Sequence, residues 1–314
     1  MNKIAFLFSG QGSQYLGMAK SYYDEFEVAR YTFEEASDVL GFDMAGLCFK
    51  GGLGAIARTE NAQPAILTAS VAAYRVFMNE VGIEPEFCCG HSLGEYSALT
   101  CAGAISFPNA LNVIRQRGIL IKEAVQKNIG TMSIIDGIDD WIIEEECTRI
   151  TSPKHMVAIN CYNSDRQTTV AGHKQAVEQI EEVAASLGAH VTPLMASAPI
   201  HSPLMKDTAV RLNKILTEYT YNSLKYTVVA NVDAIPYGGP EDVAAKLTAH
   251  MVQPVRWKKI VNFLHEHGVT IAIEMGPRNV LCNIVKSCVP DMETYFHEKR
   301  EDLENLYNRI YILR

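Results

Sequence analysis

The strongest chemical signal in this chain is a serine flanked by glycines at two-residue spacing, Gly90-x-Ser92-x-Gly94. Residues 85–89 before it are short and mostly apolar, as expected of a buried strand, and residues 95–102 after it have helical spacing. A serine on a sharp strand-to-helix turn exposes its hydroxyl, and the free N–H groups at the helix start stabilise an oxyanion. Because so short a pattern recurs by chance, it predicts a nucleophile only together with a suitable base.

His201 is the candidate base among nine histidines. A serine nucleophile needs a base within hydrogen-bonding reach. His201 lies in the stretch 198–205, which is expected to be non-helical and at which the chain re-enters the main domain. Three other histidines, His265, His267 and His297, are expected in polar, exposed segments. Three more, His155, His173 and His190, are expected at turns or strand starts. The residues alone leave the choice of base open.

The elements that must position these residues alternate between strands and helices. Residues 3–8 predict a first buried strand, the loop 10–14 follows, and apolar helices are expected at 65–80 and 108–127. This order favours a mostly parallel sheet with helices on both faces. The loop does not match a dinucleotide-binding turn, because Tyr15 stands where the third glycine belongs. Other expected elements are helices at 16–26, 29–40, 240–252, 254–267 and 280–289, and strands at 226–230 and 270–274. The tail at 300–314 is amphipathic and is expected to pack on the surface.

The stretch 129–197 has a different pattern, which predicts an inserted unit. Strands are expected at 131–135, 157–160, 167–171 and 190–195, and helices at 139–150 and 173–188. The resulting order, βαββαβ, is that of a ferredoxin-like fold.

The composition excludes several classes of protein. The 314 residues carry a net charge of −8, which argues against nucleic acid as the main partner. The eight cysteines show no paired spacing, so reduced thiols and a cytoplasmic location are expected, with no metal site. No membrane contact is expected either, since the most apolar stretch, 65–78, is interrupted by Ser70 and Arg75.

Seven ordered sequence blocks resemble the malonyl-coenzyme A:acyl carrier protein transacylases. The blocks span nearly the whole chain and are Phe8-Ser9-Gly10-Gln11-Gly12-Ser13-Gln14, Gln63-Pro64-Ala65, Gly90-His91-Ser92-Leu93-Gly94-Glu95, Arg117-Gly118, Ile200-His201-Ser202-Pro203-Leu204-Met205, Pro254-Val255-Arg256-Trp257 and Glu274-Met275-Gly276-Pro277. The resemblance implies an α/β fold with an α/β-hydrolase-like core of mostly parallel sheet, at 1–128 and 198–314, and an inserted ferredoxin-like subdomain at 129–197.

The resemblance also implies a role for each matched residue. Ser92 resembles the acylated nucleophile and His201 its general base and acid, while the backbone N–H groups of Gln11 and Leu93 resemble the oxyanion hole. Arg117 resembles the residue that binds the free carboxylate of malonate, for which a guanidinium is well shaped because it pairs bidentately. The positions expected to line the substrate pocket are Gln63, His91 and Ile200, which match the family, and His250, which departs from it.

The implied reaction moves malonyl from malonyl-coenzyme A to the phosphopantetheine thiol of a separate acyl carrier protein, by a ping-pong mechanism and without a cofactor. No Asp-Ser-Leu-type attachment site appears in the chain, which is expected to act as a monomer. Ser9 replaces the family's usual proline and Arg278-Asn279 its usual Gly-Lys-like pair. These departures favour supply of a polyketide or lipopeptide assembly line over fatty-acid synthesis.

Two other functions stay open from the sequence. A thioesterase or esterase of the α/β-hydrolase type would use the same serine and histidine, although it normally carries an acidic residue between them in chain order. A non-catalytic scaffold that binds a carrier protein is disfavoured by the intact Ser92 and His201. The base itself raises a further question, because His250 stands where the family often has glutamine. We expect a backbone carbonyl of that loop, rather than the side chain of His250 or Gln253, to orient His201.

Overall fold

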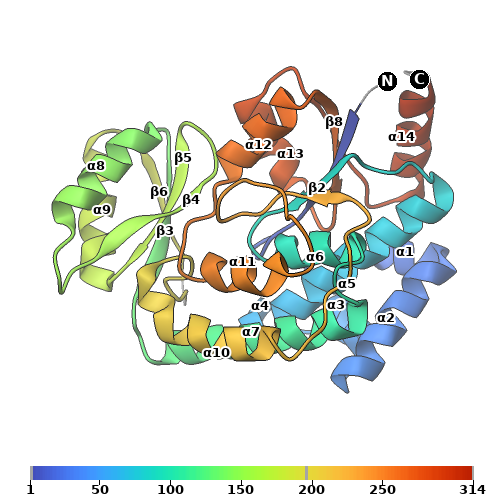
Figure 1. Ribbon diagram of the computed structural model, residues 1–314, viewed down its shortest axis with the longest axis horizontal. Coiled ribbons are helices and arrows are strands. Elements are labelled where there is room, and N and C mark those ends of the chain that lie inside the picture. Colours follow the sequence, from blue (N-terminus) through green and yellow to red (C-terminus); the bar gives the residue numbers. More distant parts are fainter. Residues whose placement is uncertain (1–2, 195–196, 313–314) are drawn as a thin grey trace.

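The computed structural model describes residues 3–194 and 197–312 and contains two sheets within those ranges. Figure 1 shows the smaller sheet and its two helices as a lobe to one side of a larger α/β body, with the two ends of the chain close together on the opposite side. The expected combination of a parallel core sheet with an antiparallel inserted sheet is thereby confirmed.

The larger sheet has five parallel strands in the described residues, in the order β7-β2-β1-β8-β9. Its strands are β1 (Lys3–Phe8), β2 (Phe87–Gly90), β7 (Thr227–Val228), β8 (Val269–Met275) and β9 (Glu293–Phe296). Phe8 at the end of β1 pairs in register with Gly90 on one side and Met275 on the other. The loops that follow these three strands therefore leave the sheet at the same edge.

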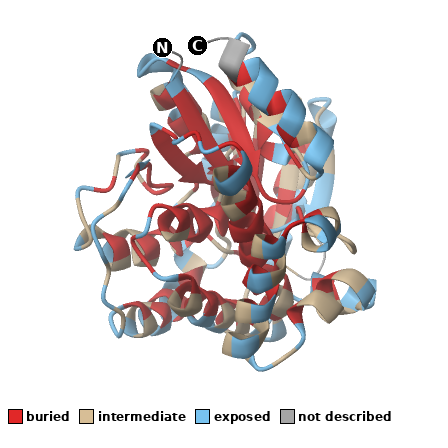
Figure 2. Ribbon diagram, turned by 90° about the vertical axis from the view of Figure 1, so that its right-hand side faces the viewer, coloured by how far each residue is buried: buried red, intermediate tan, exposed pale blue. Residues whose placement is uncertain are grey.

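Helices cover both faces of this sheet. They are α1 (Lys20–Glu25), α2 (Glu27–Leu40), α3 (Met44–Lys50), α4 (Leu53–Ala57), α5 (Thr59–Glu80), α6 (Gly94–Cys101), α7 (Phe107–Gln126), α10 (Lys206–Leu216), α11 (Asp242–His250), α12 (Trp257–Glu266), α13 (Val280–Cys288) and α14 (Arg300–Ile312), with a 3₁₀ turn, η1, at Pro203–Met205. Side chains alternate across a strand, so Phe6 and Phe8 pack in the core with α2, α5 and α7, whereas Ala5 and Leu7 pack with α12 and α13. The central strands β1, β2 and β8 are almost entirely buried between the two layers (Figure 2), whereas the edge strand β9 is only partly buried.

The smaller sheet is antiparallel, in the order β4-β5-β3-β6. Its elements are β3 (Thr131–Asp136), α8 (Asp140–Ile150), β4 (Val157–Tyr162), β5 (Gln167–Gly172), α9 (Lys174–Ser186) and β6 (His190–Leu194). The βαββαβ order is as expected, and Ile143 of α8 and Ile180 of α9 lie in a core separate from that of the larger sheet. The subdomain limits at 129 and 197 stay a prediction, and the expected end of the last strand at Met195 lies outside the described residues.

Several elements differ from the expectations for physical reasons. The helix expected from Pro254 begins only at Trp257, because the backbone of Val255 pairs instead with Asn160 and Tyr162 around β4. The helix expected at 65 begins at Thr59 and contains Pro64. Proline has no N–H for the carbonyl four residues earlier, that of Glu60, and the Arg115 guanidinium donates to this carbonyl instead. The elements missed from the sequence are α3, α4, α10, β9 and the 3₁₀ turn η1, which lies at the end of the stretch 198–205 that was expected to be non-helical. Strand β7 has two residues where five were expected.

Candidate active site

Ser92 lies on a sharp turn between β2 and α6, at the edge of the sheet where the β1 loop also emerges. The backbone φ of Ser92 is 52°, in the left-handed region that residues other than glycine rarely adopt. A Cβ at Gly90 would lie 2.0 Å from the backbone of Gly94, and one at Gly94 would lie 2.0 Å from the carbonyl oxygen of Phe8. Both glycines are therefore needed for the turn, which explains their spacing around the serine.

His201 faces Ser92 from the loop before η1. The Ser92 Oγ and His201 Nε2 atoms are 2.7 Å apart, and the two residues are only 8% and 2% exposed. His201 also has a left-handed φ, of 60°. Two strained residues from distant parts of the chain thus meet in one buried hydrogen bond, the arrangement in which a histidine activates a serine.

The backbone of His250 fixes the orientation of His201. Nδ1 of His201 lies 2.6 Å from the carbonyl oxygen of His250 and donates to it, since a carbonyl only accepts. Nε2 then carries the lone pair that faces the serine hydroxyl. Burial, followed by the nearby His250 and Arg117, holds the pKa of His201 well below its usual value, so at neutral pH the imidazole is unprotonated and its lone pair is free to accept a proton.

Asn231 holds the serine turn from the loop after β7. Its Oδ1 accepts from the Ser92 N–H at 2.8 Å, and its Nδ2 donates to the carbonyl oxygen of Gly90 at 2.7 Å. Both contacts are fully buried. The side chain thereby fixes the backbone on both sides of His91 and limits movement of the nucleophile.

The backbone N–H groups of Gln11 and Leu93 lie in the loops that follow the adjacent strands β1 and β2. Neither donates a hydrogen bond to any acceptor in residues 3–194 or 197–312. Gly10 packs so closely on His91 that a Cβ there would lie 2.6 Å from the His91 carbonyl oxygen. Two free donors on touching loops beside a nucleophile could stabilise an oxyanion.

Arg117 is a buried cation. It is 2% exposed, its guanidinium lies 5.5 Å from the centre of the Tyr96 ring, and its Nη1 donates to Gln63 Oε1 at 2.8 Å. Burial lowers its pKa, but a guanidinium remains charged at neutral pH. No carboxylate lies within ion-pairing distance of Arg117 in the described part of the chain. A buried charge without a partner is costly, so this site suits an anionic ligand.

Gln63 connects Arg117 to the loop that carries Gln11. Its Nε2 donates to Gln11 Oε1 at 3.1 Å and to Thr59 Oγ1 at 2.9 Å. Gln63 is fully buried inside α5, rather than at the helix start as its local sequence suggested. One chain of polar contacts therefore joins the Arg117 guanidinium to Gln11, whose backbone N–H is one of the two donors without a partner in the described residues.

His91 and Ile200 face the inserted subdomain. His91 Nε2 lies 2.9 Å from Asn163 Oδ1, next to β4, and its ring packs against Trp257. The carbonyl oxygen of Ile200 accepts from Asn160 Nδ2 at 2.9 Å, while the Ile200 side chain is half-buried. Both residues lie beside the Ser92–His201 pair, at the junction of the two sheets.

One further sequence interpretation is wrong. His297, expected in an exposed segment, is fully buried and bonded to the Tyr22 hydroxyl at 2.7 Å. The half-buried guanidinium of Arg115 contacts the start of α5. The eight cysteines are free, and all but Cys288 are fully buried. No group of metal-binding side chains occurs in the described ranges, and none of their helices is long and apolar enough to cross a membrane.

Asn231 and Glu95 contribute to this site although sequence reasoning assigned neither of them a role. Glu95 is fully buried in α6, with its carboxyl next to His250. Glu95 is the single charged residue in α6, and this was a usable signal for it. Asn231 gave no such signal, since it lies 139 positions from Ser92 in the sequence.

A parallel α/β core with a Ser–His pair at the turn after a strand defines an enzyme that transfers or hydrolyses acyl groups. Residues 5–299 match the acyl transferase domain family, and the chain belongs to that family. The expectation of an acyltransferase is confirmed.

Similar proteins agree with this assignment. A malonyl CoA-acyl carrier protein transacylase of Bacillus subtilis is 45% identical over 306 residues, which cover 98% of this chain and 76% of the relative. The solved malonyl CoA-acyl carrier protein transacylase of Coxiella burnetii is 33% identical with a TM-score of 0.95, covering 98% of both chains. A malonyl-transacylase solved in complex with its type II PKS acyl-carrier protein is 36% identical, with a TM-score of 0.94 over 98% of this chain and 100% of that one.

Proposed function

We propose that this enzyme moves malonyl from malonyl-coenzyme A to the phosphopantetheine thiol of a separate acyl carrier protein through an ester on Ser92. The observation that carries the proposal is the buried Arg117, which has no carboxylate partner among the described residues and is linked through Gln63 to the loop beside Ser92. A free carboxylate on the acyl group would complete this cation. Acetyl and longer unsubstituted acyl groups lack that carboxylate.

The chemistry proceeds in two half-reactions. The Ser92 Oγ attacks the thioester carbonyl carbon while His201 Nε2 takes the hydroxyl proton, and the N–H groups of Gln11 and Leu93 stabilise the oxyanion. The C–S bond then breaks, and coenzyme A leaves as the thiol with the proton from His201. In the second half-reaction the carrier thiol gives its proton to His201 and attacks the ester, and Ser92 recovers the proton.

A solved relative supports the proposed partner, and two sequence departures support the proposed pathway. One solved relative is described as bound to its type II PKS acyl-carrier protein, which supports a carrier protein as the acceptor here. Ser9, which replaces the family's proline, and the pair Arg278-Asn279 favour a polyketide or lipopeptide assembly line over fatty-acid synthesis. A cytoplasmic location and a monomeric state stay predictions.

The test uses labelled malonyl-coenzyme A with and without a carrier protein that bears phosphopantetheine. Intact-mass analysis should find one malonyl group on the wild-type protein and none on Ser92→Ala, and the loaded carrier should appear only when phosphopantetheine is present. Rapid release of free malonate without a carrier would support the thioesterase alternative instead. Native-rate transfer by Ser92→Ala would exclude the serine-ester mechanism.

A further inference from the structure

We infer that Glu95 is a positioning residue, whose buried carboxyl joins the segment that holds Ser92 to the segment that holds His201. The inference rests on the proposed function only in that the Ser92–His201 pair must be reactive. Glu95 is the second residue of α6 and is fully buried. Each of its two oxygens contacts a different one of these segments.

The first contact reaches the loop that holds the nucleophile. Glu95 Oε1 accepts from the Asn231 backbone N–H at 3.0 Å and from the Tyr237 hydroxyl at 2.8 Å. The Asn231 side chain in turn binds the backbone of Ser92 and Gly90. The Glu95 carboxyl therefore positions Asn231, and Asn231 in turn holds the turn that carries Ser92.

The second contact reaches the segment that orients the base. Glu95 Oε2 lies 2.7 Å from His250 Nδ1 in a close polar contact that is not aligned as a hydrogen bond. The His250 ring stacks on the His201 ring, with centroids 4.3 Å apart and planes at 19°. The His250 carbonyl oxygen is also the acceptor for His201 Nδ1. Anchoring the His250 side chain thus limits movement of both the stacked ring and the carbonyl.

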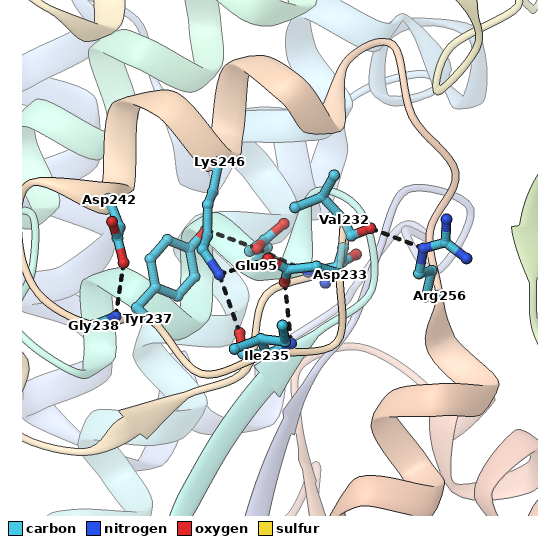
Figure 3. A network of polar contacts seen from close by, with 10 residues as sticks. Glu95, Val232, Asp233, Ile235, Tyr237, Gly238, Asp242, Lys246 and Arg256 are labelled. Atoms are coloured by element: carbon cyan, nitrogen blue, oxygen red, sulfur yellow. Dashed lines mark hydrogen bonds and ion pairs between the residues drawn. The ribbon is translucent and has the colours of Figure 1, made fainter.

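Glu95 acts through these residues rather than as a third member of a triad. Its carboxyl contacts His250, and no side-chain carboxylate in residues 3–194 or 197–312 contacts His201. Figure 3 shows Glu95 beside Tyr237, with Lys246 and Asp233 next to them, and those two pair at 2.8 Å. In a Ser-His-Asp triad the acidic residue contacts the catalytic histidine directly, whereas here His250 lies between Glu95 and His201.

The contact between Glu95 and His250 is compatible with both protonation states of the Glu95 carboxyl. Burial raises the pKa of Glu95 to about 7, while its hydrogen bonds from Tyr237 and Asn231 oppose the rise. At this close contact a protonated carboxyl is a potential donor to Nδ1 of a neutral His250, and an ionised carboxylate is a potential acceptor from it. A glutamine amide at position 95 can also donate to Nδ1 and accept at its oxygen. Glu95→Gln is therefore the conservative variant that keeps the links.

The experiment compares Glu95→Ala, Glu95→Gln and Leu264→Ala, which creates a cavity in the core on the other face of the sheet. A serine-directed fluorophosphonate counts reactive Ser92 sites and measures their rate without any acyl specificity, and malonyl-coenzyme A gives kcat and KM per reactive site. Thermal unfolding is recorded for each variant. Glu95→Ala should lose about 100-fold in both rates per reactive site with KM within about threefold, and Glu95→Gln should stay within about fivefold of wild type.

A merely structural role predicts a different result. Leu264→Ala should lower the melting temperature and the number of reactive sites, with a native rate at each remaining site. If Glu95→Ala behaves in the same way, or if Glu95→Gln loses as much rate as Glu95→Ala, the inference is overturned. Failure of the proposed function would look different, because the wild-type protein would then react with the fluorophosphonate but take no malonyl.

Discussion

The imidazole of His201 is oriented by the main chain of His250, through a contact of 2.6 Å between Nδ1 and the carbonyl oxygen. A carbonyl oxygen is a permanent acceptor, so it selects one tautomer of His201 without an ionised partner. This contact is the one expected if the loop backbone, rather than a side chain, orients the base. It also separates two possible roles of His250, one through its carbonyl and one through its ring.

The variant His250→Gln tests this separation, because it keeps the carbonyl and offers an amide donor to Glu95. Malonyl transfer should stay within about tenfold of wild type, a change of roughly 1.4 kcal/mol, with an unmoved pH profile. Steady-state kinetics between pH 6 and pH 9 would measure both quantities. A much larger loss of activity, or a pH optimum shifted by a unit or more, would show that the His250 ring itself takes part in the reaction.

Arg117 should decide which acyl groups are accepted. Loss of a buried charge-assisted pair costs about 2–5 kcal/mol, so Arg117→Ala should lose malonyl transfer by at least roughly 30-fold. Relative activity on acetyl-coenzyme A, which has no carboxylate to pair, should rise. Specificity constants for the two thioesters measure the effect.

Arg115→Ala is the matched control for that variant, since Arg115 lies two residues away on the same helix and contacts Glu60 and Asn61. It should leave the preference for malonyl over acetyl unchanged. Equal losses on both thioesters in Arg117→Ala would mean that Arg117 is structural.

The parts of this site that the sequence predicted are those with local signals. Ser92 stands in a glycine-spaced turn, and the close approaches at Gly90 and Gly94 explain that spacing. Glu95 and Asn231 could not be paired from the sequence, because their contact joins residues 136 positions apart. Tertiary contacts that no local pattern encodes also explain the burial of His297, whose partners Tyr22 and Met275 come from other elements.

Much of the fold was predicted because strands buried on both faces and amphipathic helices have distinct periodicities. The short helices α3 and α4 were missed because the intervening Gly51 and Gly52 and the brevity of both segments hide a helical repeat. The late start of α12 has another cause. Val255 pairs across to the inserted sheet, which a reading of local pattern cannot detect.

Ile200 should exclude branched acyl groups. In the resembling enzymes, bulky residues before the histidine go with malonyl and small ones with methylmalonyl, and here a β-branched, stiff side chain precedes His201. A clashing methyl group costs about 1–3 kcal/mol, so methylmalonyl-coenzyme A should be roughly 10- to 200-fold poorer than malonyl-coenzyme A. Ile200→Ala should narrow this ratio, whereas Ile200→Val should narrow it less. Comparable specificity constants of the wild type for malonyl-coenzyme A and methylmalonyl-coenzyme A would refute this role of Ile200.

Glu274 should make the stability of the protein depend on pH. Burial raises its pKa to about 7, and its oxygens accept from the Ser9 hydroxyl at 3.0 Å and the Cys282 N–H at 2.9 Å. A raised folded-state pKa means that the native protein holds the proton more tightly than the unfolded chain. The resulting stabilisation is complete below the unfolded value of 4.5 and is lost as pH rises toward 7.

Glu274→Gln removes this titration and mimics the protonated group. The unfolding free energy of the wild type relative to Glu274→Gln should therefore fall between pH 4.5 and pH 7 by up to about 3 kcal/mol, at roughly 1.4 kcal/mol for each unit of the raised pKa. Urea unfolding of both proteins at several pH values in this window measures the difference, and titrations common to both proteins cancel in it. Parallel stability curves for the two proteins would show that Glu274 keeps an ordinary pKa in the folded state.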